Sequence, residues 1–385
     1  MQGYDVGVVG AGIHGASAAF HLASRGVRCA IFERTVPAGG PTGRSSGICR
    51  AYYTNEFLAR CARDSIAMFA DFRELTGGGD AGLRRTGMLY LHPPEDLPDV
   101  RRLVERQNRL GIVTELLTPE EAAARFPDFD LEGIGVCAFE RDAGYADPAG
   151  ATAGLFRRAV ELGAVPRVGV TVRELRPRAG GGAVVVTDAG ERVECARLLV
   201  AAGPWTRPLL EPLGVDLPLR VERHVVATFR WGQARPVQAH ADLAGDHYFR
   251  PEGEDLYLVG HLRPAPEVDP DDFPTAVSGE EVEALARLVV RRVPPLARSE
   301  AHGGWASLYD VSPDWQPVIG EVAPGVFVDA GTSGHGFKLA PALARHVVDL
   351  VLGEEPDPGL AEFDALRFEQ GRTVPAGYRE ARILG

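Results

Sequence analysis

A glycine-rich turn near the start of the chain constrains the fold more than any other feature. A short apolar run leads into GAGIHG (residues 10–15), and an alanine-rich amphipathic stretch and a second apolar run follow, ending in Glu33. This order predicts strand, turn, helix and strand, with Gly10 in the tight turn, Gly12 against a pyrophosphate and Gly15 at a close helix–strand contact. The helix start would bind the phosphates, and Glu33 would accept hydrogen bonds from ribose hydroxyls. We therefore predict a dinucleotide site, because the alternative of a glycine-rich loop in an ordinary α/β unit leaves Glu33 unexplained.

Composition excludes several classes of protein. The formal charge of −12 argues against a nucleic-acid partner. No apolar run is long enough to span a bilayer, and no signal peptide precedes the first predicted strand. The 5 cysteines show no metal-ligand spacing and suit reduced thiols, so we expect a cytoplasmic protein without a metal site.

Lysine usage is unusually low. Of the 41 Lys and Arg residues, Lys338 is the single lysine. A lysine retained against such a bias is a candidate for a position where arginine does not serve, although chance survival is the alternative.

The coarse pattern predicts two domains assembled from separate segments. Helices are expected at 56–75, 100–110, 119–125, 149–162, 280–290 and 339–352, and strands at 165–172, 198–202 and 326–328, with a hairpin around 188–190. Because strand-rich insertions interrupt the α/β pattern, we predict an α/β nucleotide domain formed by residues 1–86, 144–218 and 305–385. The substrate domain would comprise residues 87–143 and 219–304.

Five stretches carry the most specific patterns: residues 5–15 with Glu33, 47–52, 198–205, YDVSPDWQPVIG (309–320) and GTSGHGFKLAP (331–341). Together they resemble the D-amino-acid oxidase superfamily of flavoproteins, above all its glycine oxidase and monomeric sarcosine oxidase branch. The resemblance covers essentially the whole chain. It implies a Rossmann-like FAD-binding domain with a discontinuous mixed-sheet substrate domain.

The resemblance also implies which residues bind FAD. The main chain near Val172 would lie by the adenine, and the turn around 334–337 would meet the flavin ring and stabilise its negative charge on reduction. The expected FAD-binding residues are Gly10, Gly12, Ile13, His14, Gly15, Glu33, Arg34, Thr42, Arg44, Ser45, Ser46, Val172, Ala202, Gly203, Trp205, Gly334, His335, Gly336, Phe337 and Lys338.

Substrate residues carry over in the same way. Sarcosine oxidases are similar in holding the substrate carboxylate between an arginine and a lysine, which correspond to Arg50 and Lys338 here. An arginine fork and a compact ammonium suit a carboxylate. His261 matches a histidine near the flavin, Tyr309 is expected to line the pocket, and Tyr257 stands where sarcosine oxidases carry a lysine that assists reaction with oxygen. A structural ion pair and a satisfied core histidine are the alternative interpretations.

The implied activity is oxidation of an amino acid. Hydride transfer from a primary or N-alkylated amine to flavin N5 would give an imine that water hydrolyses, and oxygen would be reduced to hydrogen peroxide. The flavin is expected to be non-covalent, because Ser307 replaces the cysteine that holds it in sarcosine oxidases. The alternatives are a dehydrogenase that passes electrons to a quinone or partner protein, a nicotinamide enzyme, and a flavoprotein without turnover. Neither the identity of the amine nor the oligomeric state follows from the sequence.

Overall fold

The glycine motif lies between β1 (Gly3–Val9) and α1 (Ile13–Ser24), and β2 (Cys29–Glu33) follows, as predicted. The structure, a computed structural model, describes residues 3–232 and 237–375. β1 lies in the middle of its sheet, between β2 and β12 (Arg192–Val200), and pairs in parallel with both. The first turn is thereby placed at the carboxyl edge of three neighbouring strands, where doubly wound sheets bind nucleotides.

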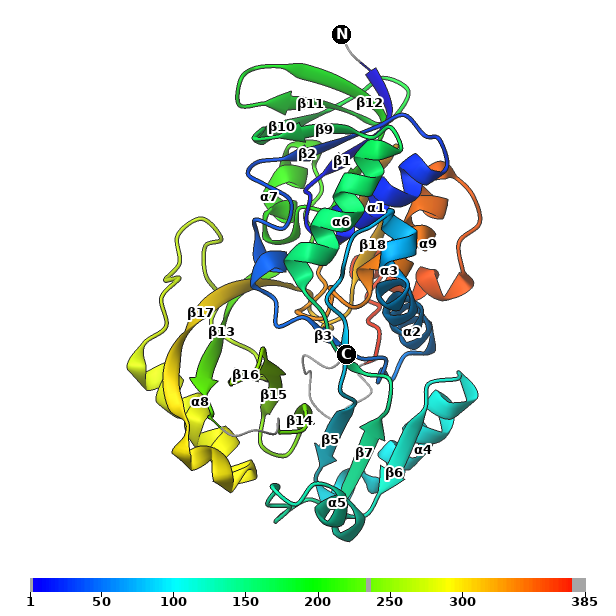
Figure 1. Ribbon diagram of the computed structural model, residues 1–385. Coiled ribbons are helices and arrows are strands. Elements are labelled where there is room, and N and C mark those ends of the chain that lie inside the picture. Colours follow the sequence, from blue (N-terminus) through cyan, green and yellow to red (C-terminus); the bar gives the residue numbers. More distant parts are fainter. Residues whose placement is uncertain (1–2, 233–236, 376–385) are drawn as a thin grey trace.

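The sheet around β1 forms the upper part of the molecule in Figure 1. Its strands run in the order β10-β11-β12-β1-β2-β9, and β19 pairs with β12 and β18. The remaining strands of this sheet are β9 (Val165–Val168), β10 (Val172–Pro177), β11 (Ala183–Thr187), β18 (Val318–Ala323) and β19 (Val326–Ala330).

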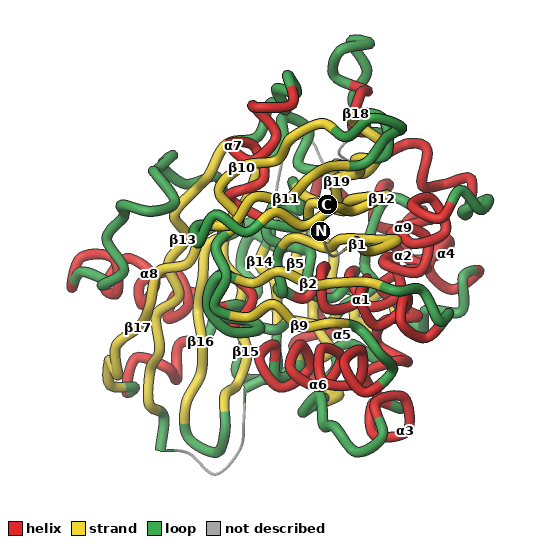
Figure 2. The backbone as a smooth tube through the Cα atoms, turned by 90° about the horizontal axis from the view of Figure 1, so that it is seen from above, coloured by secondary structure: helices red, strands yellow, loops and turns green. Residues whose placement is uncertain are grey.

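Helices cover one face of this sheet, and the apolar residues of the other face pack with those of β10, β11 and α7. Figure 2 shows α1, α6 and α9 along the same side of the strands. Their apolar residues form one core with α2, whereas a second core lies beneath β10, β11 and α7. The helices of this part are α2 (Glu56–Ala70), α3 (Phe72–Thr76), α6 (Pro148–Glu161), α7 (Thr206–Leu210) and α9 (Ala340–Leu352).

A second sheet forms the lower part of the molecule (Figure 1). Its strands run in the order β17-β13-β16-β15-β14-β5-β7-β6. Helix α8 (Gly279–Arg292) packs on one face and α4 (Leu97–Arg109) packs near the other. The strands are β5 (Met88–His92), β6 (Thr114–Leu117), β7 (Val136–Glu140), β13 (Arg220–Arg230), β14 (His240–Asp242), β15 (His247–Glu252), β16 (Leu256–His261) and β17 (Glu300–Val311).

A small sheet joins the two parts. Its strands are β3 (Ile48–Cys49), β4 (Arg84–Arg85) and β8 (Gly144–Tyr145), in the order β3-β8-β4. It therefore stands near two of the predicted segment boundaries. The division into five segments stays a proposal; β17 runs across the boundary placed at 304/305, and the segment ends at 1–2 and 376–385 lie outside the described residues.

The predicted elements differ from the observed ones in instructive places. The capping box at Thr118 is present and begins α5 (Pro119–Arg125). The strand expected at 165–172 is two strands, β9 and β10, because the chain leaves the sheet between them. The hairpin arm and the buried strand at 198–202 are instead one continuous strand, β12. Within the described residues, no helix combines the length and apolarity needed to cross a membrane.

Candidate active site

A cavity of about 420 Å³ runs along the carboxyl edge of the β1 sheet. Segments far apart in the sequence meet there: the glycine motif, the end of β2, the loop at 39–45, the segment 170–173, the turn after β12 and the turn after β19. Most of the predicted cofactor residues line it: Gly10, Gly12, Ile13, His14, Glu33, Arg34, Thr42, Ser45, Val172, Ala202, Gly203, Trp205, Gly334, Gly336 and Phe337.

The glycines of the motif have the geometry that a phosphate cradle requires. Gly10 has φ +100°, and a Cβ there would lie 2.4 Å from the Ala201 carbonyl oxygen. A Cβ on Gly15 would lie 1.9 Å from the Gly10 carbonyl oxygen, so only glycine lets α1 pack this close to the turn. Gly12, which lines the cavity, is the N-cap of α1 and lacks a side-chain cap. The Ile13 N–H at the helix start donates to Thr42 Oγ1 at 3.2 Å, and Gly12, Ile13 and Thr42 line the cavity there.

Glu33 lies at the tip of β2, beside the segment that the sequence places near an adenine. Its Oε2 accepts from the Ala11 N–H at 2.9 Å, and its Oε1 accepts from the Thr35 N–H at 2.8 Å. The Val170 N–H donates to the Glu33 carbonyl oxygen at 2.9 Å. These contacts fix the carboxylate at the cavity wall, where it can accept hydrogen bonds from hydroxyl groups.

An acid that the sequence did not reveal joins this end of the cavity. Asp271 lies in the proline-containing loop after β16, and its Oδ1 accepts from Arg34 at 3.1 Å and from the Trp205 indole N–H at 2.9 Å. The Arg34 guanidinium lies over the Trp205 ring at 3.8 Å. All three side chains line the cavity. An exposed loop acid carries no local sequence signal for such a contact.

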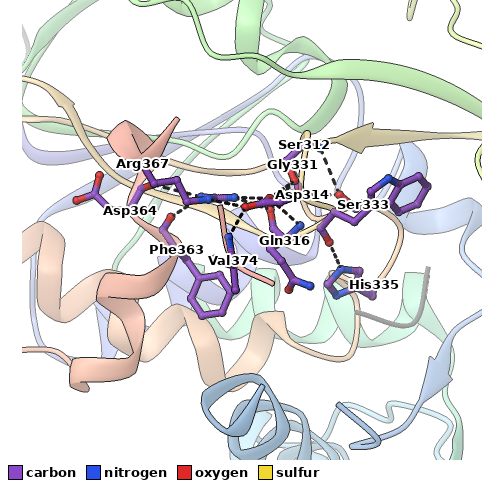
Figure 3. A network of polar contacts seen from close by, with 11 residues as sticks. Ser312, Asp314, Gln316, Gly331, Ser333, His335, Phe363, Asp364, Arg367 and Val374 are labelled. Atoms are coloured by element: carbon purple, nitrogen blue, oxygen red, sulfur yellow. Dashed lines mark hydrogen bonds and ion pairs between the residues drawn. The ribbon is translucent and has the colours of Figure 1, made fainter. Parts of the chain in front are cut away.

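The turn after β19 closes the other end of the cavity. Ser333 there has φ +51°, and its hydroxyl accepts from the Ser312 N–H and donates to the Gly331 carbonyl oxygen. Figure 3 shows how this turn is held from behind by residues of the YDVSPDWQPVIG segment. The Asp310 carboxylate accepts from the Gly331 N–H at 2.6 Å. The motifs at residues 309–320 and 331–341 are therefore hydrogen-bonded to each other.

A buried arginine from the C-terminal part anchors that support. Arg367 is 0% exposed and donates to both Asp314 oxygens, at 2.9 and 2.8 Å (Figure 3). It also donates to the carbonyl oxygens of Phe363 and Gln316. A buried ion pair with this many hydrogen bonds specifies one arrangement of the segment.

Tyr309, on β17, lines the cavity beside the turn after β19. A Cβ on Gly334 would fall 2.2 Å from Tyr309 Cε2, so the ring lies directly on the turn. Its hydroxyl hydrogen-bonds Tyr248, which also contacts Ser46. Burial and the neighbouring Tyr248 raise the pKa of Tyr309 well above its ordinary value, so the phenol is neutral.

The sequence analysis did not identify His224, a histidine of β13 that lies beside Tyr309. Its ring stacks on Tyr309 with centroids 3.9 Å apart. Burial lowers its pKa, although Glu222, whose Oε2 is 3.1 Å from His224 Nε2, opposes the effect. The neutral ring therefore donates its Nε2–H to Glu222.

Arg50 and Lys338 are both buried, with exposures of 2% and 5%, and they interact electrostatically. Lys338 Nζ donates to the His335 carbonyl oxygen at 3.3 Å, and the Arg50 guanidinium lies over the Tyr53 ring at 4.5 Å. Burial, and then Arg50, lower the pKa of Lys338 well below its ordinary value. Two neighbouring buried cations are unfavourable on their own and suit an anionic ligand.

Glu140, a buried acid on β7, was also missed. Its oxygens accept from the Ala51 N–H at 2.7 Å and the Tyr90 hydroxyl at 2.8 Å. Burial raises its pKa to about 7, although these hydrogen bonds and Arg50 oppose the rise. Glu140 therefore fixes the main chain next to Arg50.

His335 has a defined tautomer. Burial, and then Lys338, lower its pKa to about 3, so the ring is neutral. Its Nε2 is 2.9 Å from the Trp315 carbonyl oxygen and its Nδ1 is 3.3 Å from the Tyr53 hydroxyl. A carbonyl only accepts, so Nε2 carries the proton and Nδ1 accepts from Tyr53.

Two predicted catalytic residues lie elsewhere. Tyr257 packs in the core under α8, stacks on Phe229 and pairs its hydroxyl with Ser299 Oγ at 2.5 Å. Because side chains alternate along a strand, His261 shares that face of β16, whereas Gly260 faces Tyr248. Burial lowers the pKa of His261 to about 4. Tyr257 thus has the contacts of a core residue, and the catalytic role of His261, which interacts electrostatically with His224, stays a prediction.

The other predicted residues support the cavity from outside. Gly15 packs behind the turn, and the exposed Arg44 accepts from the Trp305 indole through its carbonyl oxygen at 2.8 Å. Ser46, His335 and Lys338 lie on the side of Arg50 and Tyr248. In the described part of the chain, no cluster of three or more His, Cys, Asp or Glu could hold a metal ion.

Comparison with known proteins agrees with this geometry. Residues 5–350 match the family model described as FAD dependent oxidoreductase. The chain is 30% identical to the human (Homo sapiens) peroxisomal sarcosine oxidase, over 95% of this chain and 96% of that protein. It is 26% identical to the structure of glycine oxidase from Geobacillus kaustophilus, with a TM-score of 0.82 over 95% and 99% of the two chains. The L-proline dehydrogenase from P. horikoshii shares the fold, with a TM-score of 0.87 and 24% identity over 97% and 100%.

Proposed function

The chain belongs to the FAD dependent oxidoreductase family, and we propose that it oxidises the C–N bond of an amino acid that carries a primary or N-alkylated amine. It is an FAD-dependent enzyme of the group that acts on amino acids or amines. The relatives support oxidation of an amino acid, because two of them are named as sarcosine oxidase and glycine oxidase.

The observation that carries the proposal is the buried pair Arg50 and Lys338. Two neighbouring buried cations favour an anion between them, and an amino-acid substrate supplies a carboxylate. Glu140 lies near Arg50 and offsets part of the charge. The site therefore suits a substrate with one carboxylate.

The residues of the chain would bind and orient the substrate. Arg50 and Lys338 would hold the carboxylate, and Tyr309, Tyr248 and His224 would form the wall beside the reacting carbon. The two tyrosines are neutral phenols and therefore no bases, and burial lowers the pKa of His224, which makes it a weak base. The amine, bound as the free base, needs no general base, and the acceleration comes from position and electrostatics.

Bound FAD would supply the oxidant for this reaction, taking up a hydride from the carbon next to the amine. The substrate becomes an imine, and water hydrolyses it to an aldehyde or keto acid and an amine or ammonia. The cavity residues fit this cofactor, since they offer a glycine cradle, the Glu33 carboxylate as an acceptor for ribose hydroxyls and a supported turn. The five cysteines are buried and none is among the described residues that line the cavity, which supports non-covalent binding.

Oxygen is the proposed electron acceptor, and a quinone or partner protein is the second candidate. Lys338, the single lysine of the chain, lies beside Arg50, and the face of β16 toward Tyr248 presents Leu258 and Gly260. No second lysine is thus left to assist reaction with oxygen, and this observation supports the second candidate, whereas the relatives named as sarcosine oxidase and glycine oxidase support oxygen.

An anaerobic titration of the purified protein tests the proposal. Sarcosine, glycine, proline, pipecolate and D-alanine are added in turn while the flavin absorbance is followed. Bleaching by one of them supports amine oxidation, and admission of air then separates an oxidase, which reoxidises rapidly, from a dehydrogenase that needs a dye. A yellow protein that no amine bleaches would contradict the proposal.

A further inference from the structure

Arg34 and Trp205 meet across one end of the cofactor cavity. Arg34 follows β2 and Trp205 lies in the turn after β12, and these two strands flank β1 on opposite sides, about 10 Å apart. The Arg34 guanidinium nevertheless lies 3.8 Å from the centre of the Trp205 ring. Both side chains line the cavity together with Glu33 and Val172. The contact therefore bridges the end of the cavity that is expected to hold the adenosine half of FAD.

Asp271, which comes from the substrate part of the chain, holds both of these side chains. Its Oδ1 accepts from Arg34 Nη1 at 3.1 Å and from the Trp205 indole N–H at 2.9 Å. The Arg34 and Asp271 side chains are 41% and 66% exposed. Water can replace the partners of such groups when they separate, so the contact breaks and forms again at a small cost. These contacts thus have the properties of a fastening that opens.

The loop that carries Asp271, residues 264–276, is anchored at both ends on β13. The Glu222 carboxylate and the Arg223 main chain hold its start, and the Arg223 guanidinium holds its end. Figure 1 shows this yellow-green loop beside β17, reaching from the lower part of the molecule toward the upper part. The contacts are Ala265 N–H to Glu222 Oε2 at 2.9 Å, Arg223 N–H to the Pro266 carbonyl oxygen at 3.1 Å, and the Arg223 guanidinium to the carbonyl oxygens of Pro274 and Ala276 at 2.7 and 2.8 Å.

A second cavity, of about 180 Å³, lies between the middle of this loop and the nucleotide part of the molecule. The loop lines one side of it and the turn after β12 lines another. The residues concerned are Glu267, Val268 and Pro270 of the loop and Gly203, Pro204, Arg207 and Pro208 of the turn and α7. Space rather than packed side chains therefore lies beneath this stretch of the loop, and the contacts of Asp271 fasten it to the nucleotide part.

We propose that the 264–276 loop is a strap across the adenosine end of the FAD cavity, which Asp271 fastens to Arg34 and Trp205 and which unfastens before FAD leaves. A loop that closes over a ligand commonly sets the rate at which that ligand departs. The strap joins the two parts of the molecule, since its anchors are on β13 and its fastening is at the ends of β2 and β12. The proposal needs the cofactor but not the amine substrate proposed above.

The rate at which the full-length holoenzyme releases FAD tests this proposal. Isotopically labelled FAD is added in excess, and mass spectrometry of the protein-bound flavin follows the exchange. Asp271→Ala is expected to release FAD roughly 3- to 30-fold faster than the unaltered protein, because it loses an exposed ion pair and a hydrogen bond. Trp205→Phe keeps an aromatic ring but removes the indole N–H, so it is expected to release FAD faster by roughly 2- to 10-fold.

Asp272→Ala is the matched control, because it removes the same charge from the same loop. Asp272 joins the turn through its main chain, whose N–H donates to the Asp269 carbonyl oxygen at 3.3 Å. Its release rate is expected to stay within about 2-fold of the unaltered protein. The double variant Asp271→Ala/Trp205→Phe is expected to release FAD no faster than Asp271→Ala alone, because the indole N–H has then already lost its partner.

An unchanged release rate in Asp271→Ala would overturn the proposal. Additive effects of Asp271→Ala and Trp205→Phe would overturn it too, because the two residues would then act on FAD separately. The same acceleration in Asp272→Ala would show that the charge of the loop, and not a fastening, sets the rate. None of the three replaced side chains is buried, so the variants are expected to fold.

Discussion

Replacing Lys338 by methionine separates a functional role for this residue from a structural one. Methionine keeps most of the apolar stem and removes the ammonium. In the structure that ammonium is buried, donates to one neutral carbonyl at 3.3 Å and lies near Arg50. A residue that serves only the fold would not be kept in this environment, so we expect Lys338→Met to stabilise the protein and to weaken carboxylate binding.

The sizes of both effects follow from general constants. Exchanging a buried ionic group for an apolar one of similar volume stabilises proteins by about 1–4 kcal/mol. A chain of this length has an unfolding entropy of about 0.8 kcal/mol/K near the midpoint, so Tm should rise by roughly 1–5 °C. Removing one charge from a buried pair with its ligand costs about 2–5 kcal/mol, so binding of a carboxylate should weaken at least about 30-fold.

Calorimetry and a flavin absorbance titration with benzoate, a carboxylate without an oxidisable amine, measure the two quantities on the same preparation. Lys338→Arg serves as the control, since it keeps the charge and should retain part of the affinity. A lower Tm together with unchanged benzoate affinity in Lys338→Met would refute the reasoning, because Lys338 would then be a structural cation.

Three further expectations concern the scaffold. Gly334→Ala should lower Tm and weaken FAD binding, because the new Cβ would overlap Tyr309 at 2.2 Å. The control is Gly26→Ala, which is also at positive φ but has nothing within 4 Å of the new Cβ; it should cost only about 1 kcal/mol of stability and leave FAD binding unchanged. Equal FAD affinity in the two variants would contradict this. Arg367→Met should destabilise the protein by about 3–5 kcal/mol in denaturant titrations. The control is Arg60→Met, which breaks a partly exposed pair with Asp357 and should cost less than about 1 kcal/mol. Similar costs for the two variants would be inconsistent with the network of Figure 3. The pKa of His335 is lowered to about 3. Its contribution to stability is therefore complete above the pKa of 6.5 of the unfolded chain, and it is lost as the pH falls toward 3, by up to about 1.4 kcal/mol per pH unit. A His335→Gln variant whose stability depends on pH as steeply as that of the unaltered protein would exclude this role.

The sequence predicts the nucleotide half of the protein well because its signals are local. Glycines that require positive φ or close packing, an acid at a strand tip and an arginine or lysine in a specific motif each constrain their own neighbourhood. The structure brings Gly10, Gly12, Glu33 and Gly334 to one cavity for that reason. Membership of the family and the use of FAD were predicted on the same residues and are confirmed.

The substrate side was predicted less well because its residues depend on the facing of strands. The catalytic roles predicted for Tyr257 and His261 depend on which face of β16 each occupies, and a shift of one residue exchanges the two faces of a strand. Glu140, His224 and Asp271 reach the site from strands or loops that pair at long range.

The most direct test of the central claim compares an amino acid with its own carboxamide. The amino acid that bleaches the flavin in the anaerobic titration and its carboxamide share the amine and the reacting carbon, and differ in the carboxylate that Arg50 and Lys338 would hold. Both are mixed with the protein anaerobically and the rate of flavin reduction is followed at saturation and below it. The account predicts fast bleaching by the acid and a loss of at least about 100-fold in the second-order rate with the carboxamide. Equal rates for the two compounds would contradict a carboxylate clamp at Arg50 and Lys338.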